Sequence, residues 1–316
     1  MNDGMGPVET NANRPKRGFD PEAARLMRLA TYASVGVAGV LIVTKFAAWL
    51  ATDSVSLLST LIDSLLDAAA SLVNLFAVRH ALQPADDEHR FGHGKAEPLA
   101  GLVQAAFIVG SALFLMLQAG ERMVTPRFIQ HASVGYAVMV FSIVMTVALV
   151  TFQRYVVKRS GSLAIGTDQL HYQSDVLING SVLVSIFLAS EMGFPYADPL
   201  FAMAIALYIV VTAWKIGRDA LDILMDRELP DDERERIRQI ALGISGVQGV
   251  HELRTRSSGS HVFIQMHVEI DGDLPLRRAH RIADAVEIQV AAAFPNAEVI
   301  VHQDPDDLDE DHEFQS

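Results

Sequence analysis

The chain has 316 residues, half of them hydrophobic, and its mean hydropathy of +0.25 is higher than soluble proteins of this size usually reach. The net charge of −13 at pH 7, with acidic residues crowded into the C-terminal quarter, argues against a nucleic-acid partner. Because cysteine is absent, disulfides and thiolate metal sites are excluded, and any metal ligands must be His, Asp or Glu. The composition therefore favours a membrane protein.

The first 26 residues form a polar segment that carries Arg14, Lys16 and Arg17. A signal peptide would instead have an apolar core that ends in a small-residue cleavage site. We therefore expect residues 1–26 to be a cytoplasmic N-terminal arm.

Six apolar stretches follow, and each is long enough to cross a bilayer as a helix of about 20 residues. They lie near residues 28–51, 56–80, 98–120, 133–155, 163–190 and 197–219. Lys45 and Lys215 lie toward helix ends, where we expect the long side chains to reach the membrane surface. Residues 27–226 are thus predicted to be a transmembrane domain of six helices.

Basic residues cluster on one side of the predicted membrane. They precede the first span and follow the sixth, and they lie between the second and third spans and between the fourth and fifth. The loops on the other side carry fewer basic residues, with Arg122 and Arg127 in one of them. Because cytoplasmic loops are enriched in Lys and Arg, both termini are predicted to be cytoplasmic.

From Leu229 the composition becomes that of a soluble domain. PDDERERIRQIALG predicts a helix that begins with proline and acidic residues, and LPLRRAHRIADAVEIQVAAAF predicts an amphipathic helix. VHELRTRSS and HVFIQMHVEID predict a β-hairpin, because alternate residues from Val262 to Ile270 are apolar, and AEVIVHQ predicts a last strand. The order α-β-β-α-β predicts a small ferredoxin-like α+β domain over residues 227–304, followed by an acidic, disordered tail over residues 305–316.

Two of the predicted membrane helices carry ionisable residues with helical spacing. Asp63 and Asp67 are four residues apart on the second helix, and Asn74 continues their stripe. The fifth helix has a similar stripe, which consists of Asp168, His171, Asp175 and Asn179. Such residues could cap a solvated helix end or join helices by hydrogen bonds, but ionisable groups at membrane depth usually face a polar cavity. We therefore favour a divalent-cation site made of Asp63, Asp67, His171 and Asp175, where metal and proton would compete.

Two further groups of residues could bind metal. The loop PADDEHRFGHGKAEP places Asp86, His89 and His93 close together, and the pattern alone leaves an ordinary polar loop equally open. The C-terminal domain carries His251, His261, His267, His280 and His302, with Asp304 near the last. The residues alone slightly favour a scattered surface set there. Lys95 and Asp226 lie on the cytoplasmic side of the predicted membrane, where a surface ion pair would contribute little.

Several motifs together resemble the cation diffusion facilitator family of bacteria, and most closely its zinc and ferrous-iron efflux branch. They are DSLLD on the second span, VRHALQPADDEHRFGHGKAEPLA after it, LHYQSDVLING on the fifth span, and HELRTR and VIVHQDP in the C-terminal domain. The resemblance covers roughly residues 27 to 305. It implies a multi-pass protein of the bacterial inner membrane that forms a homodimer.

The resemblance also implies roles for individual residues. Asp63, Asp67, His171 and Asp175 would form the transport site, and Asp86, His89 and His93 a loop site. A cytoplasmic binuclear site would use His251, His267, His280, His302 and Asp304, with Asp304 bridging two ions, while His261 falls outside the pattern. Lys95 and Asp226 would form a charge interlock near the dimer interface. Zn²⁺ would be both substrate and regulatory ion, and no organic cofactor is expected.

The expected function is therefore efflux of a divalent metal, Zn²⁺ first, from the cytoplasm by proton-coupled antiport through alternating access. The ligand set also accepts Fe²⁺, Cd²⁺, Co²⁺ or Mn²⁺ as main substrate. A membrane-embedded metallohydrolase is a remote alternative, because the sequence has no HExxH motif and four protein ligands leave no open position for water. A metal sensor that signals through its histidine-rich C-terminal domain is a third hypothesis.

Overall fold

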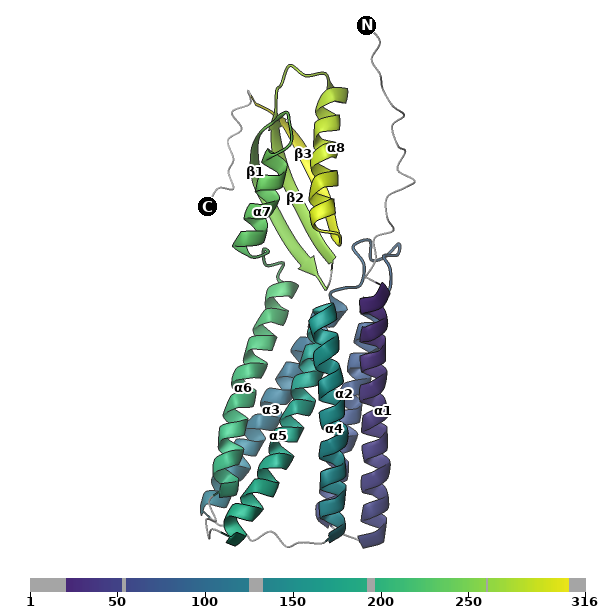
Figure 1. Cartoon of the computed structure of the whole chain (residues 1–316), viewed down its shortest axis with the longest axis vertical. Coiled ribbons are helices and arrows are strands. Elements are labelled where there is room, and N and C mark those ends of the chain that lie inside the picture. The colour runs from purple at the N-terminus through teal and green to yellow at the C-terminus, as the bar shows by residue number, and fades with distance from the viewer. Residues whose placement is uncertain (1–20, 53–54, 125–132, 192–196, 260, 307–316) are drawn as a thin grey trace.

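The computed structural model describes residues 21–52, 55–124, 133–191, 197–259 and 261–306. Six long helices form a bundle, and a small α/β domain stacks on one end of it (Figure 1). The bundle consists of α1 (Pro21–Thr52), α2 (Val55–Ala81), α3 (Ala96–Val124), α4 (Ser133–Ser160), α5 (Leu163–Glu191) and α6 (Ala197–Leu224). This architecture confirms the predicted fold class. Most of the predicted N-terminal arm and of the acidic tail lies outside the described residues.

Each predicted span lies within the observed helix, and the helix extends furthest beyond one end of the span in three cases. Helix α1 begins at Pro21 rather than near residue 28, α4 ends at Ser160 rather than near 155, and α6 ends at Leu224 rather than near 219. The added turns contain charged residues such as Arg25, Lys158 and Asp222. Hydropathy marks where lipid would end, whereas backbone hydrogen bonding continues the helix into a polar environment.

The surface of the bundle has the character of a lipid-facing surface. Large apolar side chains stand outward, among them Phe107, Leu117 and Trp214, each at least 70% exposed. Over the described residues, five helices are long and apolar enough to cross a membrane, and α5 is the exception. The first half of α5 carries Asp168, His171 and Asp175, which reduce its hydropathy. The chain is thus a multi-pass membrane protein, and α5 carries several ionisable residues within its first half.

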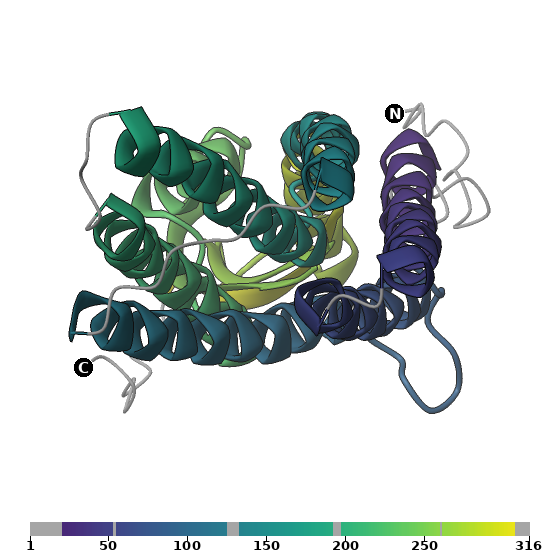
Figure 2. The same ribbon diagram turned by 90° about the horizontal axis from the view of Figure 1, so that it is seen from below.

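Each helix of the bundle runs alongside one or more neighbours (Figure 2). Helix α3 runs along α6, α1 along α2, and α4 along α5. Helix α5 also contacts α2, α3 and α6, so it has neighbours on several sides. Its polar residues therefore face other helices rather than lipid.

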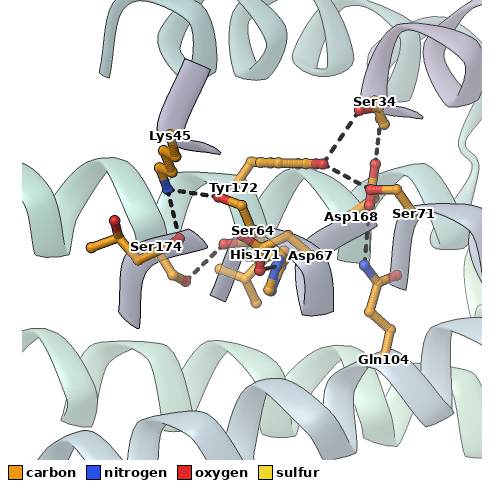
Figure 3. A network of polar contacts seen from close by, with 12 residues as sticks. Ser34, Lys45, Ser64, Asp67, Ser71, Gln104, Asp168, His171, Tyr172 and Ser174 are labelled. Atoms are coloured by element: carbon orange, nitrogen blue, oxygen red, sulfur yellow. Dashed lines mark hydrogen bonds and ion pairs between the residues drawn. The ribbon is translucent and has the colours of Figure 1, made fainter. Parts of the chain in front are cut away.

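The buried Asp168 carboxylate links α5 to three other helices. Its Oδ2 accepts hydrogen bonds from Ser34 Oγ of α1 at 2.6 Å and Gln153 Nε2 of α4 at 2.7 Å. Its Oδ1 accepts one from Gln104 Nε2 of α3 at 3.1 Å (Figure 3). All four side chains are buried, which makes these hydrogen bonds strong and their loss costly. Asp168 therefore fixes the position of the first turns of α5.

The C-terminal domain has the predicted α-β-β-α-β order. It consists of α7 (Asp231–Leu242), β1 (Val247–Ser258), β2 (His261–Ile270), α8 (Leu276–Ala293) and β3 (Ala297–Pro305). The sheet order is β1-β2-β3, with β1 antiparallel and β3 parallel to β2. The apolar residues of β2 pack in one core with residues of α7 and α8, as the alternation predicted. The other face of β2 carries His267.

The loop between α2 and α3 packs against the tip of the β1–β2 hairpin. Arg256 lies between Phe91 and Phe263, with its guanidinium carbon 5.0 Å and 4.6 Å from the two ring centres. A Cβ on Gly94 would lie only 2.3 Å from the carbonyl oxygen of Ser258, so only glycine permits this approach. The loop and the C-terminal domain are therefore in direct contact.

We expect Asp168→Ala to destabilise the bundle. Three buried donors would lose their acceptor, and each unsatisfied group costs about 1–3 kcal/mol. The thermal unfolding midpoint of the purified protein in detergent should fall by several degrees. Asp219→Ala, at an exposed position of α6, is the control and should change the midpoint much less. Equal midpoints for the two variants would contradict this role of Asp168.

We expect Gly94→Ala to separate the loop from the hairpin, because the added methyl group overlaps the Ser258 carbonyl. Amide hydrogen exchange should accelerate near residues 91–94 and 257–259. Gly110→Ala is the control, since a Cβ there meets no atom within 4 Å in the described structure. Unchanged exchange in the Gly94 variant would show that the contact is absent in solution.

Candidate metal centres

Three groups of His and Asp side chains among the described residues have ligand atoms within 4.8 Å of one another. The first lies inside the bundle and consists of Asp67 of α2 with His171 and Asp175 of α5. His171 Nε2 lies 2.9 Å from Asp67 Oδ1, and both side chains are about one-fifth exposed (Figure 3). His171 and Asp175 face the same way because they are four residues apart on a helix. One imidazole and two carboxylates form a ligand set suited to a divalent cation.

The other members of the two predicted stripes have different positions. Asp63 is exposed on α2, one turn from Asp67, and it lies outside the group of three. Asp168 is the buried link between helices, and Asn179 donates to the carbonyl of Asp175 at 2.8 Å. Asn74 is buried, and its amide has no hydrogen-bond partner among the described residues. Residues that share one helix face in the sequence pattern therefore differ in role: some are candidate metal ligands, and others form hydrogen bonds within or between helices.

Lys45 does not reach the membrane surface as predicted. Its Nζ donates to Ser64 Oγ of α2 at 2.6 Å and to the Thr60 carbonyl at 3.2 Å (Figure 3). Ser64 is buried and stands between Asp63 and Asp67 in the sequence, so the ammonium lies against the inner face of α2. The sequence placed Lys45 near a helix end, and only the packing of α1 against α2 showed that it points inward.

The second group lies in the loop between α2 and α3 and consists of Asp86, His89 and His93. His93 Nε2 is 3.3 Å and His89 Nδ1 is 3.5 Å from the Asp86 carboxylate. The backbone N–H of His89 donates to Asp86 and holds the pKa of that carboxyl below its usual value. His93 is buried, and its Nδ1 has no hydrogen-bond partner in the described part of the chain. The loop therefore presents a preformed three-ligand group whose carboxylate is held in its ionised form.

The third group lies on the open face of the C-terminal sheet and consists of His251, His267 and Asp304. Asp304 Oδ2 is 2.8 Å from His267 Nδ1 and 3.3 Å from His251 Nε2. Strand register explains this arrangement, because His251 pairs with His267 and His267 pairs with His302 across the three strands. His302 Nε2 lies 3.1 Å from Asp304 Oδ1, so the carboxylate contacts imidazoles with both oxygens.

The remaining histidines of the domain lie elsewhere. His280 is exposed on α8 and approaches Asp284 at 3.6 Å, and α8 covers the opposite, apolar face of the sheet. The structure therefore does not bring His280 to Asp304 within one chain. His261, which falls outside the family pattern, begins β2, and burial lowers the pKa of its imidazole.

Glu252 is a site residue that the sequence did not reveal. It lies at a β-bulge between His251 and Arg254, with a positive φ of 45°. Its Oε2 is 3.8 Å from His267 Nε2, so it borders the third group. Simple strand alternation could not locate it, because a bulge changes which face a residue points to.

Lys95 and Asp226 form an ion pair at the junction of the bundle and the C-terminal domain. Lys95 Nζ lies 2.9 Å from Asp226 Oδ1, and Arg256 Nη1 approaches the same oxygen at 3.5 Å. Partial burial raises the pKa of Asp226, but Lys95 and Arg256 together lower it more, so this pKa lies below its usual value. The pair links the start of α3 to the residues that follow α6.

Comparison with known proteins gives the chain two family domains and close relatives. Residues 31–225 match the cation efflux transmembrane domain, and residues 229–306 match the cation efflux protein cytoplasmic domain, named ZT_dimer. The chain is 50% identical over 287 residues to proteins named cation-efflux pump FieF from Serratia proteamaculans (strain 568) and Yersinia pestis (strain Pestoides F). Each alignment covers 91% of this chain and 95% of the relative.

Solved structures resemble the C-terminal part. CzrB in its zinc form is 37% identical, covering 26% of this chain and 93% of that chain, with a TM-score of 0.24. A nickel form of the MamM CTD is 27% identical, covering 24% of this chain and 98% of that chain, with a TM-score of 0.23. The two family matches and the 50% identity over most of its length show that this chain belongs to the cation diffusion facilitator family of cation efflux proteins.

Proposed function

We propose that this chain exports a divalent metal ion, Zn²⁺ first among the candidates, from the cytoplasm in exchange for protons. The observation that carries the proposal is the group of Asp67, His171 and Asp175 inside the bundle. Ionisable residues at membrane depth are costly and usually mark an ion pathway. The relatives that are named cation-efflux pumps support the direction of transport.

The ligand chemistry supports coupling to protons. Carboxylates and imidazole bind a metal only when deprotonated, so a proton and a metal ion compete for the same oxygen and nitrogen atoms. In the inward-facing state the deprotonated group would bind the metal, and protons from the other side would displace it. Asp63, one turn from Asp67 on α2, would join as the fourth ligand when the helices move.

The loop and C-terminal groups are proposed to bind regulatory ions. Asp86, His89 and His93 would form the loop site, and His251, His267, His302 and Asp304 would form the C-terminal site with Asp304 bridging two ions. His280 would contribute from a second copy of the chain, because α8 lies on the other face of the sheet. This arrangement requires a homodimer, with the Lys95–Asp226 ion pair close to the interface.

The proposal also assigns the chain to the membrane. Residues 27–226 would be the transmembrane domain and residues 227–304 a cytoplasmic metal-binding domain, in a bacterial inner membrane with both termini cytoplasmic. Basic residues near the bundle end that contacts the C-terminal domain, such as Arg79 and Arg159, support this orientation.

We expect Asp67→Ala to abolish metal transport. The substitution removes one of two carboxylates that face His171 and leaves too few ligands for tight binding. Transport is measured in reconstituted vesicles with a pH gradient, using Zn²⁺, Fe²⁺, Cd²⁺ and Mn²⁺ in parallel. Asp219→Ala should transport normally. An Asp67→Ala variant that transports as well as the unaltered protein would overturn the site assignment.

We expect metal binding by the full-length protein to weaken as the pH falls from neutral to acidic. The protonated forms of Asp and His are favoured at low pH and cannot bind a metal, so the apparent Kd should rise. Calorimetric titration with Zn²⁺ at several pH values measures the effect, and proton release on binding gives a second readout. A Kd independent of pH, with no proton released, would contradict the exchange mechanism.

A further inference from the structure

Lys45 brings a positive charge into the same part of the bundle as the proposed transport site. Its ammonium is held by two acceptors of α2, the Ser64 hydroxyl at 2.6 Å and the Thr60 carbonyl at 3.2 Å. Ser64 is only 1% exposed, so the contact lies inside the bundle. Figure 3 shows Lys45, Ser64, Asp67 and His171 in one polar network.

This placement differs from that of an ordinary membrane lysine. A lysine at the edge of a span usually extends its ammonium to the lipid headgroups, because a charge near the bilayer centre costs about 2.5–3.5 kcal/mol on insertion scales. Lys215 of α6 is exposed on the bundle surface, whereas Lys45 turns toward α2. A charge that is held inside despite this cost indicates a function beyond anchoring in the membrane.

The charges that act on Lys45 are those of the candidate ligands. Burial opposes the charge of its ammonium, and the carboxylates of Asp67, Asp175 and Asp63 are the nearby charges that favour it. Three ionised carboxylates and one ammonium leave two net negative charges, which equals the charge of one divalent ion in magnitude. Charge interactions are strong at membrane depth, where the dielectric constant is low. The site with a divalent ion bound would therefore be electrically balanced only with Lys45 present.

We propose that Lys45 is a built-in counter-cation that sets the affinity of the transport site for divalent metal. It does not ligate the ion. It offsets one carboxylate, which weakens the attraction for the metal enough for release and stabilises the ligand group after the metal has left. This inference rests on the proposed transport function and assigns a role to a residue outside the ligand set.

The test replaces Lys45 by two neutral residues and one charged residue in the full-length protein. Lys45→Gln keeps polarity and Lys45→Met keeps length and suits burial, while Lys45→Arg keeps the charge. Lys215→Gln is the matched control, since it removes a lysine from the bundle surface. All variants carry His89→Ala and Asp304→Ala, so that Zn²⁺ titration reports on the transport site.

Loss of the ammonium should strengthen metal binding, because a repulsive charge near a divalent ion is removed. We expect both neutral variants to bind Zn²⁺ about tenfold or more tightly. In vesicles their KM for Zn²⁺ should fall and their maximal rate should also fall, because release becomes slower. Lys45→Arg and Lys215→Gln should retain both values.

A neutral variant that binds Zn²⁺ as weakly as, or more weakly than, the parent protein carrying only His89→Ala and Asp304→Ala would overturn the proposal. Weaker binding would show that Lys45 only supports the packing of α1 on α2. A further variant adds Asp67→Ala to the same background. It tells whether a negative result for Lys45 reflects a wrong role for Lys45 or a wrongly placed transport site. If Zn²⁺ binding survives Asp67→Ala, the transport site itself is wrongly placed.

Discussion

The position of α5 depends on the buried carboxylate of Asp168. Hydrogen bonds from Ser34, Gln104 and Gln153 tie this one side chain to α1, α3 and α4. Breaking such a network would leave several buried polar groups without hydrogen-bond partners, which is costly inside a membrane protein. Because His171 follows one turn later, the same constraint places the candidate ligands of α5 opposite Asp67.

A polar seam extends from this link through the interior of the bundle. Tyr172 shares a hydrogen bond of 2.8 Å with Ser71 of α2, and Lys45 reaches Ser64 from α1. Lipid provides no hydrogen bonds, so polar groups inside a membrane must find partners on neighbouring helices. These polar contacts join the helices and also keep the charged candidate ligands close together. The need of buried polar groups for hydrogen-bond partners therefore serves both stability and ion binding.

The C-terminal domain contacts the bundle and the loop between α2 and α3 at several points. Gly94 lies very close to the Ser258 carbonyl, and Arg256 lies between the rings of Phe91 and Phe263. The Asp226 carboxylate forms ion pairs with both Lys95 and Arg256. The loop group of Asp86, His89 and His93 immediately precedes this junction. Occupancy of the loop by a cation would thus act on the segment where the two domains meet.

The sequence by itself determined the six spans, the α-β-β-α-β order, the apolar face of β2 and the residue types of the candidate sites. These features depend on hydropathy and on the short periods of helices and strands, which are local properties. Tertiary structure alone decided that Asp168 links helices, that Lys45 points inward, that Glu252 borders the sheet group and that His280 lies away from it. These outcomes depend on which elements pack together and on one β-bulge, and residues far apart in sequence do not reveal their distances through local patterns.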